Sequence, residues 1–134
     1  MLVPARPVGM TVAELLLRGR PDSRQGNLKV QRLAGQVALD EHGAIVGAGD
    51  LSAQTTQVMK NIGLALAAAN ATFSDVVKIT TYVVGYRPEH RAIIGKARSP
   101  FFADMPPPAS TLVGVSALAA PEWLIEIEAI AVTG

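Results

Sequence analysis

The chain has 134 residues, and its 12 basic and 11 acidic side chains give a formal charge of +1, so we expect one domain and no strongly basic surface for nucleic acid. The hydrophobic fraction of 49% and the charged fraction of 17% are typical of a folded protein and exclude a disordered one. The absence of cysteine excludes disulfides and cysteine nucleophiles, and two histidines are too few for a histidine-built metal centre.

No segment reaches the roughly 18 uncharged apolar residues of a membrane span, and the first residues lack the apolar core of a secretory signal. We therefore expect a cytoplasmic protein without membrane contact. Scattered prolines and glycines over residues 1–27 predict an irregular N-terminal arm, in which Thr11 and Glu14 have the spacing of a capping box before a short helical turn. Residues 28–134 then form a single α+β domain.

A β-hairpin is predicted at the start of this domain. Residues 28–39 have the composition of a strand, and Gly35 within them indicates a bulge or a close approach to the backbone. The run 40–43 is typical of a turn, and a short returning strand is expected over 44–47.

A helix is predicted from Asp50 or Ser52, either of which can cap it, to about residue 69, with Asn70 as a residue that tolerates the left-handed conformation at its end. The polar residues Gln54, Gln57 and Asn61 lie off the apolar stripe. The stripe itself recurs at steps of three and four residues: Leu51, Thr55, Val58, Ile62, Leu66 and Ala69.

The β-branched run 76–84 predicts a strand, and Pro88 suits the first turn of a second helix whose apolar face contains Ile93, Ala97 and Phe101. Two last strands are expected over 110–115 and 123–132. The predicted order is ββαβαββ, an α+β fold with a mixed sheet and two helices packed on one face. The opposite face has no cover, so we expect it to pack against another copy of the chain.

Glu126 and Glu128 are two residues apart on the last strand and share one face. Two interpretations stay open: a cleft in which one carboxylate acts as general base on water, or a solvated face with interface salt bridges, which is the commoner case. Gly35 and Gln36 either present a backbone amide to a ligand or mark a bulge.

Ser110 and Thr111 stand at the start of a strand, where a hydroxyl either binds a carboxylate or bonds local backbone. Four arginines could bind an anion, and their spacing does not distinguish among them: Arg32, Arg87, Arg91 and Arg98. We find no phosphate loop, dinucleotide fingerprint or metalloprotease motif.

The last third of the sequence resembles the signature of the Rid family, the reactive intermediate deaminases, also called the YjgF or endoribonuclease L-PSP family. The resemblance is carried by Pro108–Leu118 (PASTLVGVSAL) and Ile125–Ala131 (IEIEAIA). Three shorter runs match in order, so that the resemblance covers residues 28–132: Leu33–Gln36, Ala53–Thr55 and Asp75–Thr80.

The resemblance implies a chorismate-mutase-like fold assembled as a homotrimer, with the sheets forming an inner barrel and ligand clefts between subunits. Enzymes of the family hydrolyse reactive imines and enamines, such as 2-aminoacrylate and its imine, to 2-keto acids and ammonia, and they need no cofactor. If this chain is an enzyme, it is therefore expected to be a deaminase, a hydrolase acting on C–N bonds.

Residue by residue, the resemblance implies that Glu126 is the catalytic glutamate and Gly35 the glycine that contacts substrate. The arginine that normally binds the substrate carboxylate falls on Ser110, followed by Thr111, and an asparagine of the second helix falls on Gly95. A serine supplies no charge, and loss of a desolvated bidentate pair weakens binding by roughly 2–5 kcal/mol. Arg32, or an arginine of a neighbouring subunit, is the candidate to compensate.

Two functions stay open on these grounds, with a third far behind. One is imine or enamine hydrolysis with a substrate preference altered by Ser110. Another is a non-catalytic, metabolite-binding or regulatory trimer of the same fold. RNA cleavage, suggested by the older family label, is disfavoured by the balanced charge and by only six aromatic residues.

Overall fold

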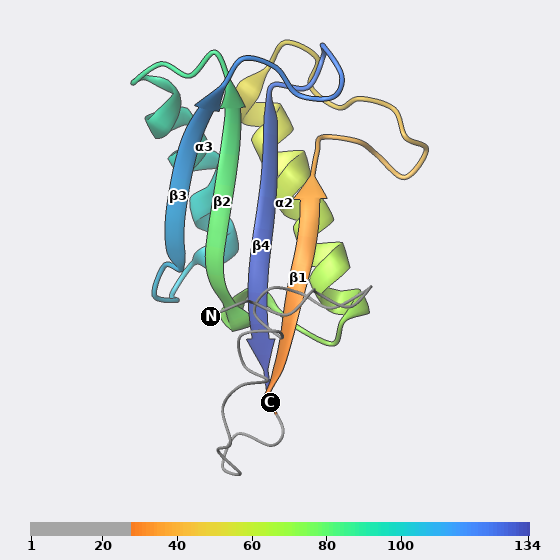
Figure 1. Ribbon diagram of the computed structural model, residues 1–134, viewed down its shortest axis with the longest axis vertical. Coiled ribbons are helices and arrows are strands. Elements are labelled where there is room, and N and C mark those ends of the chain that lie inside the picture. Colours follow the sequence, from red (N-terminus) through yellow and green to blue (C-terminus); the bar gives the residue numbers. More distant parts are fainter. Residues whose placement is uncertain (1–27) are drawn as a thin grey trace, which may run out of the picture.

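The computed structural model describes residues 28–134, and the arm predicted over 1–27 lies outside them. Four strands form one sheet in the order β1-β4-β2-β3 (Figure 1). β2 and β3 are parallel, whereas β4 is antiparallel to both of its neighbours, so the predicted mixed sheet is confirmed. The strands are β1 (Lys29–Gln36), β2 (Val76–Val84), β3 (Ala109–Val115) and β4 (Ile125–Thr133).

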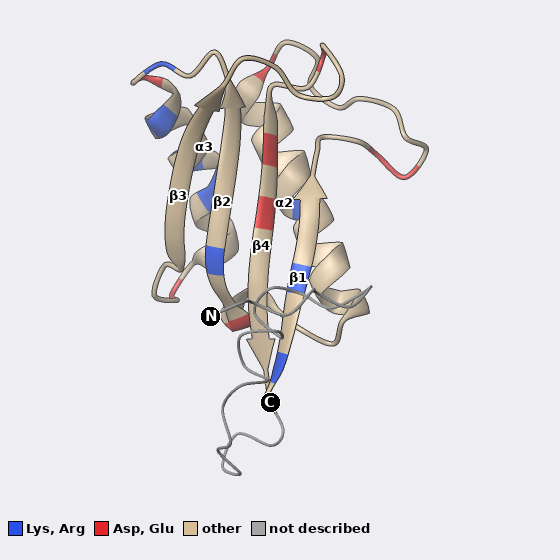
Figure 2. Cartoon of the chain, in the orientation of Figure 1, with Lys and Arg blue, Asp and Glu red and all other residues tan. Residues whose placement is uncertain are grey.

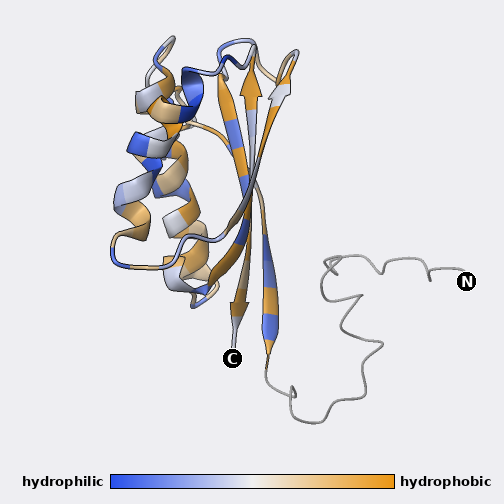
Figure 3. Cartoon of the chain, turned by 90° about the vertical axis from the view of Figure 1, so that its left-hand side faces the viewer, coloured by the Kyte–Doolittle hydropathy of each residue, from blue (hydrophilic) through white to orange (hydrophobic). Residues whose placement is uncertain are grey.

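Two helices, α2 (Leu51–Ala68) and α3 (His90–Arg98), lie on the same face of this sheet, as Figure 3 shows from the side. Short 3-10 turns, η2 (Phe73–Asp75) and η3 (Ser99–Phe102), connect them to the strands. Among the described residues, no helix covers the opposite face of the sheet. The predicted α+β class with both helices on one face is therefore confirmed, and the second face is left open within this chain.

The boundaries of α2 follow from local chemistry. The side chain of Asp50 accepts a hydrogen bond from the backbone N–H of Ala53 at 3.0 Å, which satisfies one of the free amides of the first turn. Asn70 follows the helix with φ of 55°, the left-handed conformation that was expected there. Both predicted ends of the helix are thus confirmed.

The core lies between the sheet and the helices. On β4 the apolar residues Ile125, Ile127, Ala129 and Ala131 are buried, whereas the residues between them are half-exposed on the open face. The predicted stripe of α2 packs against them through Thr55, Val58, Ile62 and Leu66. This alternation places both glutamates of β4 on the open face, as the period of a strand requires.

Gln54 was predicted to lie off the apolar stripe, but it is fully buried. Its amide nitrogen donates to the carbonyls of Gly47 and Glu122, and its amide oxygen accepts from the N–H of Leu124. Burial is tolerated because every polar atom of the side chain has a partner. The side chain thereby ties two loops to the helix, an arrangement that helical periodicity does not reveal.

Two further expectations need correction. In α3 the predicted apolar face was wrong at one position, because Ile94 is buried and Ile93 is 38% exposed. The other two predicted residues, Ala97 and Phe101, are half-buried, and Phe101 packs against the core.

The expected returning strand over 44–47 is reduced to a single bridge between Leu39 and Ile45. Two backbone hydrogen bonds still connect this segment to the chain before the turn, from Val46 N–H to the Ala38 carbonyl and from Asp40 N–H to the Ala44 carbonyl. The side chain of Asn61 donates to the carbonyls at both ends of 37–39.

Within residues 28–134, neither helix is both long enough and apolar enough to cross a membrane. The same residues contain no group of three or more side chains that could together hold a metal ion.

Candidate functional site

The strand β1 bulges at the glycine that the sequence singled out. The pairing of β1 with β4 shifts register between Leu33 and Gln36, so that Ala34 and Gly35 form the predicted bulge. The side chain of Glu126 lies directly over Gly35: an ideal Cβ there would be 2.7 Å from Glu126 Cδ and would overlap the carboxylate. The absence of a side chain at Gly35 therefore allows the carboxylate to lie this close to the backbone.

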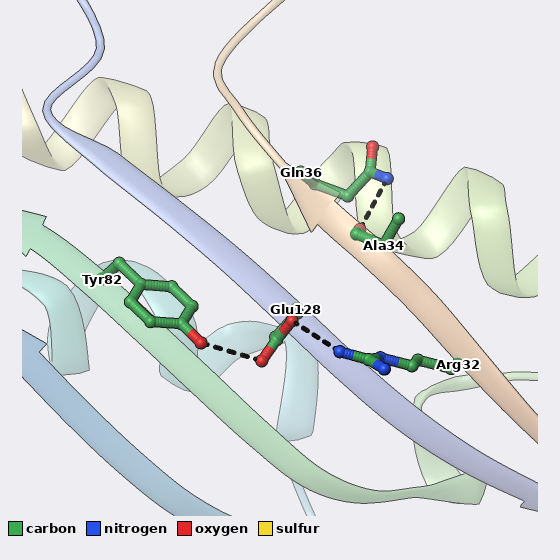
Figure 4. A network of polar contacts seen from close by, with 5 residues as sticks. All are labelled: Arg32, Ala34, Gln36, Tyr82 and Glu128. Atoms are coloured by element: carbon green, nitrogen blue, oxygen red, sulfur yellow. Dashed lines mark hydrogen bonds and ion pairs between the residues drawn. The ribbon is translucent and has the colours of Figure 1, made fainter. Parts of the chain in front are cut away.

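The two glutamates of β4 have different surroundings. Glu128 Oε1 accepts a hydrogen bond of 2.9 Å from the hydroxyl of Tyr82, and its Oε2 lies 3.7 Å from a guanidinium nitrogen of Arg32 (Figure 4). Glu126 makes neither a hydrogen bond nor an ion pair through its carboxylate within the described part of the chain. A carboxylate without such partners is free to accept a proton from a bound water, whereas Glu128 is engaged.

The hydrogen bond to Glu128 raises the pKa of the Tyr82 hydroxyl above its ordinary value of 10.0, with smaller contributions from desolvation and from the nearby carboxylate charges. The phenol therefore stays protonated at neutral pH and acts as a donor that holds Glu128 in place.

Arg32 therefore pairs with Glu128 on the open face of the sheet. From the sequence it was the candidate to bind a substrate carboxylate if position 110, a serine here, is where the family has its arginine. The structure instead places it on β1 beside Glu128, at the opposite edge of the sheet from β3.

Ser110 and Thr111 point to opposite faces of β3, as neighbouring strand residues do. On the open face, Thr111 Oγ1 accepts a hydrogen bond from the ammonium of Lys78. On the helix face, Ser110 Oγ accepts one of 3.3 Å from Arg98 Nη1. The two hydroxyls therefore belong to different surroundings.

Arg98 is the residue that sequence reasoning did not distinguish from the other arginines. It is the last residue of α3, half-buried, and its Nη1 also lies 3.4 Å from Oγ1 of the fully buried Thr81. Burial lowers the pKa of the Arg98 guanidinium below its usual value. A basic residue in the last turn of a helix is a common feature that offsets the helix dipole, so the sequence held no specific signal for it.

Gly95 lies one turn before Arg98 on α3, and residues at this spacing are neighbours on a helix surface. An ideal Cβ at Gly95 would contact no atom within 4 Å. The surface beside the guanidinium is consequently open to a small molecule.

The sheet separates these two groups of residues. Tyr82 pairs with Glu126 on one side and with Val113 on the other, so Glu126 and Ser110 lie two strand spacings and three residues apart, about 14 Å between backbones. They also face opposite sides of the sheet. A ligand of a few atoms cannot contact both in one chain.

A broad open groove begins at Gly35 and Gln36. Its wall consists of the end of β1, the residues that follow it and one side of α2, together with two aromatic rings, and it includes neither Glu126 nor Arg98. The lining includes Gly35, Gln36, Leu39, Asn61, Phe73 and Phe101.

Comparison with known sequences gives a consistent result. Residues 27–133 match the sequence model of the family described as Endoribonuclease L-PSP. A RutC family protein of Pyrococcus horikoshii is 36% identical over 99 residues, which cover 74% of this chain and 75% of the relative. Protein DfrA of Myxococcus xanthus is 35% identical over 105 residues, 78% of this chain and 77% of that protein.

Solved structures share the fold. The Rid family protein YyfB of Yersinia pestis is 46% identical and superposes with a TM-score of 0.74, covering 77% of each chain. Escherichia coli TdcF, whose structure contains bound serine, is 25% identical with a TM-score of 0.70, covering 78% of this chain and 81% of TdcF.

Proposed function

Because this chain belongs to the Rid family described as Endoribonuclease L-PSP, we propose that it hydrolyses small reactive imines or enamines to keto compounds and ammonia. The observation that carries this proposal is the placement of Glu126: a half-buried carboxylate without a hydrogen-bond or ion-pair partner among the described residues, directly over the backbone of Gly35. That arrangement supports a water held between a general base and a bound substrate.

The chemistry needs one water and no redox step. An enamine first tautomerises to its imine, and water then attacks the imine carbon while Glu126 accepts the proton of that water. The proton returned to nitrogen completes the neutral carbinolamine. Glu126 then moves the hydroxyl proton to the amine while the C=O bond forms and the C–N bond breaks. The products are a carbonyl compound and ammonia, and the carboxylate is regenerated. Exposed backbone at the Gly35 bulge is suited to orienting the imine nitrogen.

The reaction is proposed to take place between subunits of a homotrimer. The open sheet face of one copy needs a cover, and the two groups of candidate residues lie at opposite edges of the sheet. A cleft between copies allows Gly35 and Glu126 of one subunit to face Ser110 and Gly95 of the next. In that arrangement the sheets form an inner barrel with the helices outside.

A non-catalytic, metabolite-binding trimer is the second candidate. It is favoured by Ser110, which replaces the charged residue of the family with a hydroxyl, and by TdcF, a relative whose structure contains serine, a stable amino acid. RNA cleavage has less support, because the formal charge is only +1 and, in Figure 2, the acidic bands of β4 lie between the basic bands of β1 and β2.

The deciding experiment measures release of ammonia and keto acid from freshly generated 2-iminobutyrate and 2-aminoacrylate, with light scattering on the same samples to establish the trimer. We expect turnover by the natural protein and a loss of about 10²-fold or more in kcat for Glu126→Gln. Glu128→Gln is the matched control, because it changes the same side chain two residues along the strand, and it should retain most of the activity.

Ser110→Arg separates the two candidates. If both proteins are trimers but only Ser110→Arg is active, the cleft of the natural protein is intact and adapted to another ligand. If neither protein turns over substrate although both are trimers, hydrolysis is the wrong assignment and the binding function takes its place. Cleavage of a mixed RNA that is lost in Glu126→Gln would revive the third function.

A further inference from the structure

Arg98 carries a charge that the described part of the chain does not neutralise. Within residues 28–134 the ion pairs are Arg32 with Glu128 and His42 with Glu41, and Arg98 belongs to neither. Its partners are two neutral hydroxyls, those of Thr81 and Ser110, at 3.4 and 3.3 Å. A half-buried cation with only neutral partners is poorly compensated, and a bound anion would supply the missing charge.

The guanidinium also keeps most of its donors. It has five N–H groups in a planar fork, and both of its hydrogen bonds start from Nη1. Nη2 and Nε have no partner among the described residues. Two parallel donors are what a carboxylate needs for a bidentate contact.

The position of the guanidinium is determined by three elements. Its carbon chain comes from the end of α3, Thr81 holds Nη1 from the buried face of β2, and Ser110 does so from the exposed edge of β3. Because the stem is half-buried, the head group has few alternative positions. Beside it, Gly95 leaves the surface open.

We propose that Arg98 binds the substrate carboxylate, so that the charge comes from helix α3 while Ser110 orients it from the strand position where the family has its arginine. This inference rests on the proposed function and names its substrate class as 2-imino and 2-keto carboxylates. The role of Ser110 thereby changes from a weak ligand to a positioning residue. The clearest alternative is that Arg98 only braces α3 against the sheet edge.

The test uses 2-oxobutyrate, a stable keto acid product, and its uncharged amide as paired probes in titration calorimetry on the trimer. The natural protein should prefer the carboxylate. Arg98→Met keeps the length of the stem without the charge, and it should weaken binding of 2-oxobutyrate about 30-fold or more while leaving the amide unaffected. Arg91→Met is the matched control, because Arg91 lies on the same helix and is exposed, and it should change neither affinity.

Two more variants guard against a purely structural effect. Ser110→Asp retains Arg98 and pairs with it, so it should abolish carboxylate binding in a folded trimer, whereas Ser110→Asn should not. Arg98→Met combined with Ser110→Arg should restore the preference for the carboxylate. A bracing role predicts a lower melting temperature with the preference unchanged.

The outcomes distinguish the two proposals. The role of Arg98 is overturned if the Arg98→Met and Ser110→Asp variants prefer 2-oxobutyrate over its amide as strongly as the natural protein does. That result leaves the proposed hydrolysis unaffected. A natural trimer that neither binds 2-oxobutyrate nor hydrolyses 2-iminobutyrate overturns both. Hydrolysis of the imine without any preference for the carboxylate supports the proposed function and refutes Arg98 as the anion site.

Discussion

The two edges of the sheet offer opposite chemistry. At the β1–β4 edge lies Glu126, whose carboxylate has no partner among residues 28–134 and stands over the backbone of Gly35 on the open face. At the β3 edge, a guanidinium, Arg98, reaches Ser110 on the helix face. One edge presents a base beside a half-exposed backbone, and the other presents a guanidinium whose Nη2 and Nε have no partner in that same part of the chain. Each edge is incomplete for a substrate that carries both an imine and a carboxylate.

The proposed assembly would bring these two edges together. Residues about 14 Å apart and on opposite faces cannot act on one small molecule, yet a rotation that brings one edge against the other edge of the next copy joins them. A heterologous contact of this kind, repeated around a closed ring, yields as many sites as subunits.

Mixing two inactive variants tests this comparison most strongly. Glu126→Gln removes the base from one edge and Arg98→Met removes the cation from the other. Trimers assembled from an equal mixture should regain activity in about a quarter of their clefts by random combination, because such a cleft receives an intact edge from each variant. Activity is measured as ammonia release after joint refolding, with each variant refolded alone as control. Absence of recovery in confirmed mixed trimers would place both edges of one site in a single chain.

Gly35→Ala perturbs the carboxylate edge without removing its charge. The added methyl group would overlap the Glu126 side chain and should displace it from the bulge. We expect a loss of about 10-fold in kcat, because a misplaced base loses its alignment with the water, with a small change in the free energy of unfolding since the end of a flexible side chain can move. A structure of the variant should show Glu126 rotated away. Unchanged kcat with Glu126 still in place would contradict the importance of this contact.

Gly95→Ala is the corresponding change at the other edge, and it should raise the free energy of unfolding. A methyl group there meets no neighbour, and alanine in place of glycine within a helix stabilises it by about 1 kcal/mol. Urea denaturation measures the gain. If steady-state kinetics with the imine substrate also show a higher Michaelis constant and an unchanged kcat, the ligand lies against this surface.

Tyr82→Phe affects the residues between the two edges. Loss of its hydrogen bond to Glu128 should cost about 1 kcal/mol of unfolding free energy. Because the pKa of Tyr82 is raised in the folded protein, its contribution is present below pH 10 and is lost as the pH rises through the higher folded value. Denaturation curves from pH 8 to above 10 should therefore show a smaller alkaline loss of stability for Tyr82→Phe than for the natural protein. Equal slopes would mean that this hydrogen bond does not contribute to stability.

Much of the carboxylate edge was predictable from the sequence because its signals are local. A glycine inside a strand indicates a bulge, and glutamates two apart indicate a shared face. Periodicity does not show which of two equivalent glutamates keeps a free carboxylate. That difference comes from Tyr82 and Arg32, on two other strands of the sheet.

The cation edge was not predictable, because its parts come from α3, β2 and β3 and meet only through packing. Two wrong predictions in the helices have the same origin: Gln54 is buried since two distant loops supply its partners, and Ile94 rather than Ile93 faces the core because the strands determine the rotation of α3. The sequence by itself determined the four strands of the sheet, the two helices and the α+β class, since these depend on short-range periodicity and backbone chemistry, whereas the roles of Gly35 and Glu126 were implied by the family resemblance. Only the tertiary structure decided which arginine stands beside Ser110, because contacts between distant segments leave no regular pattern along the chain.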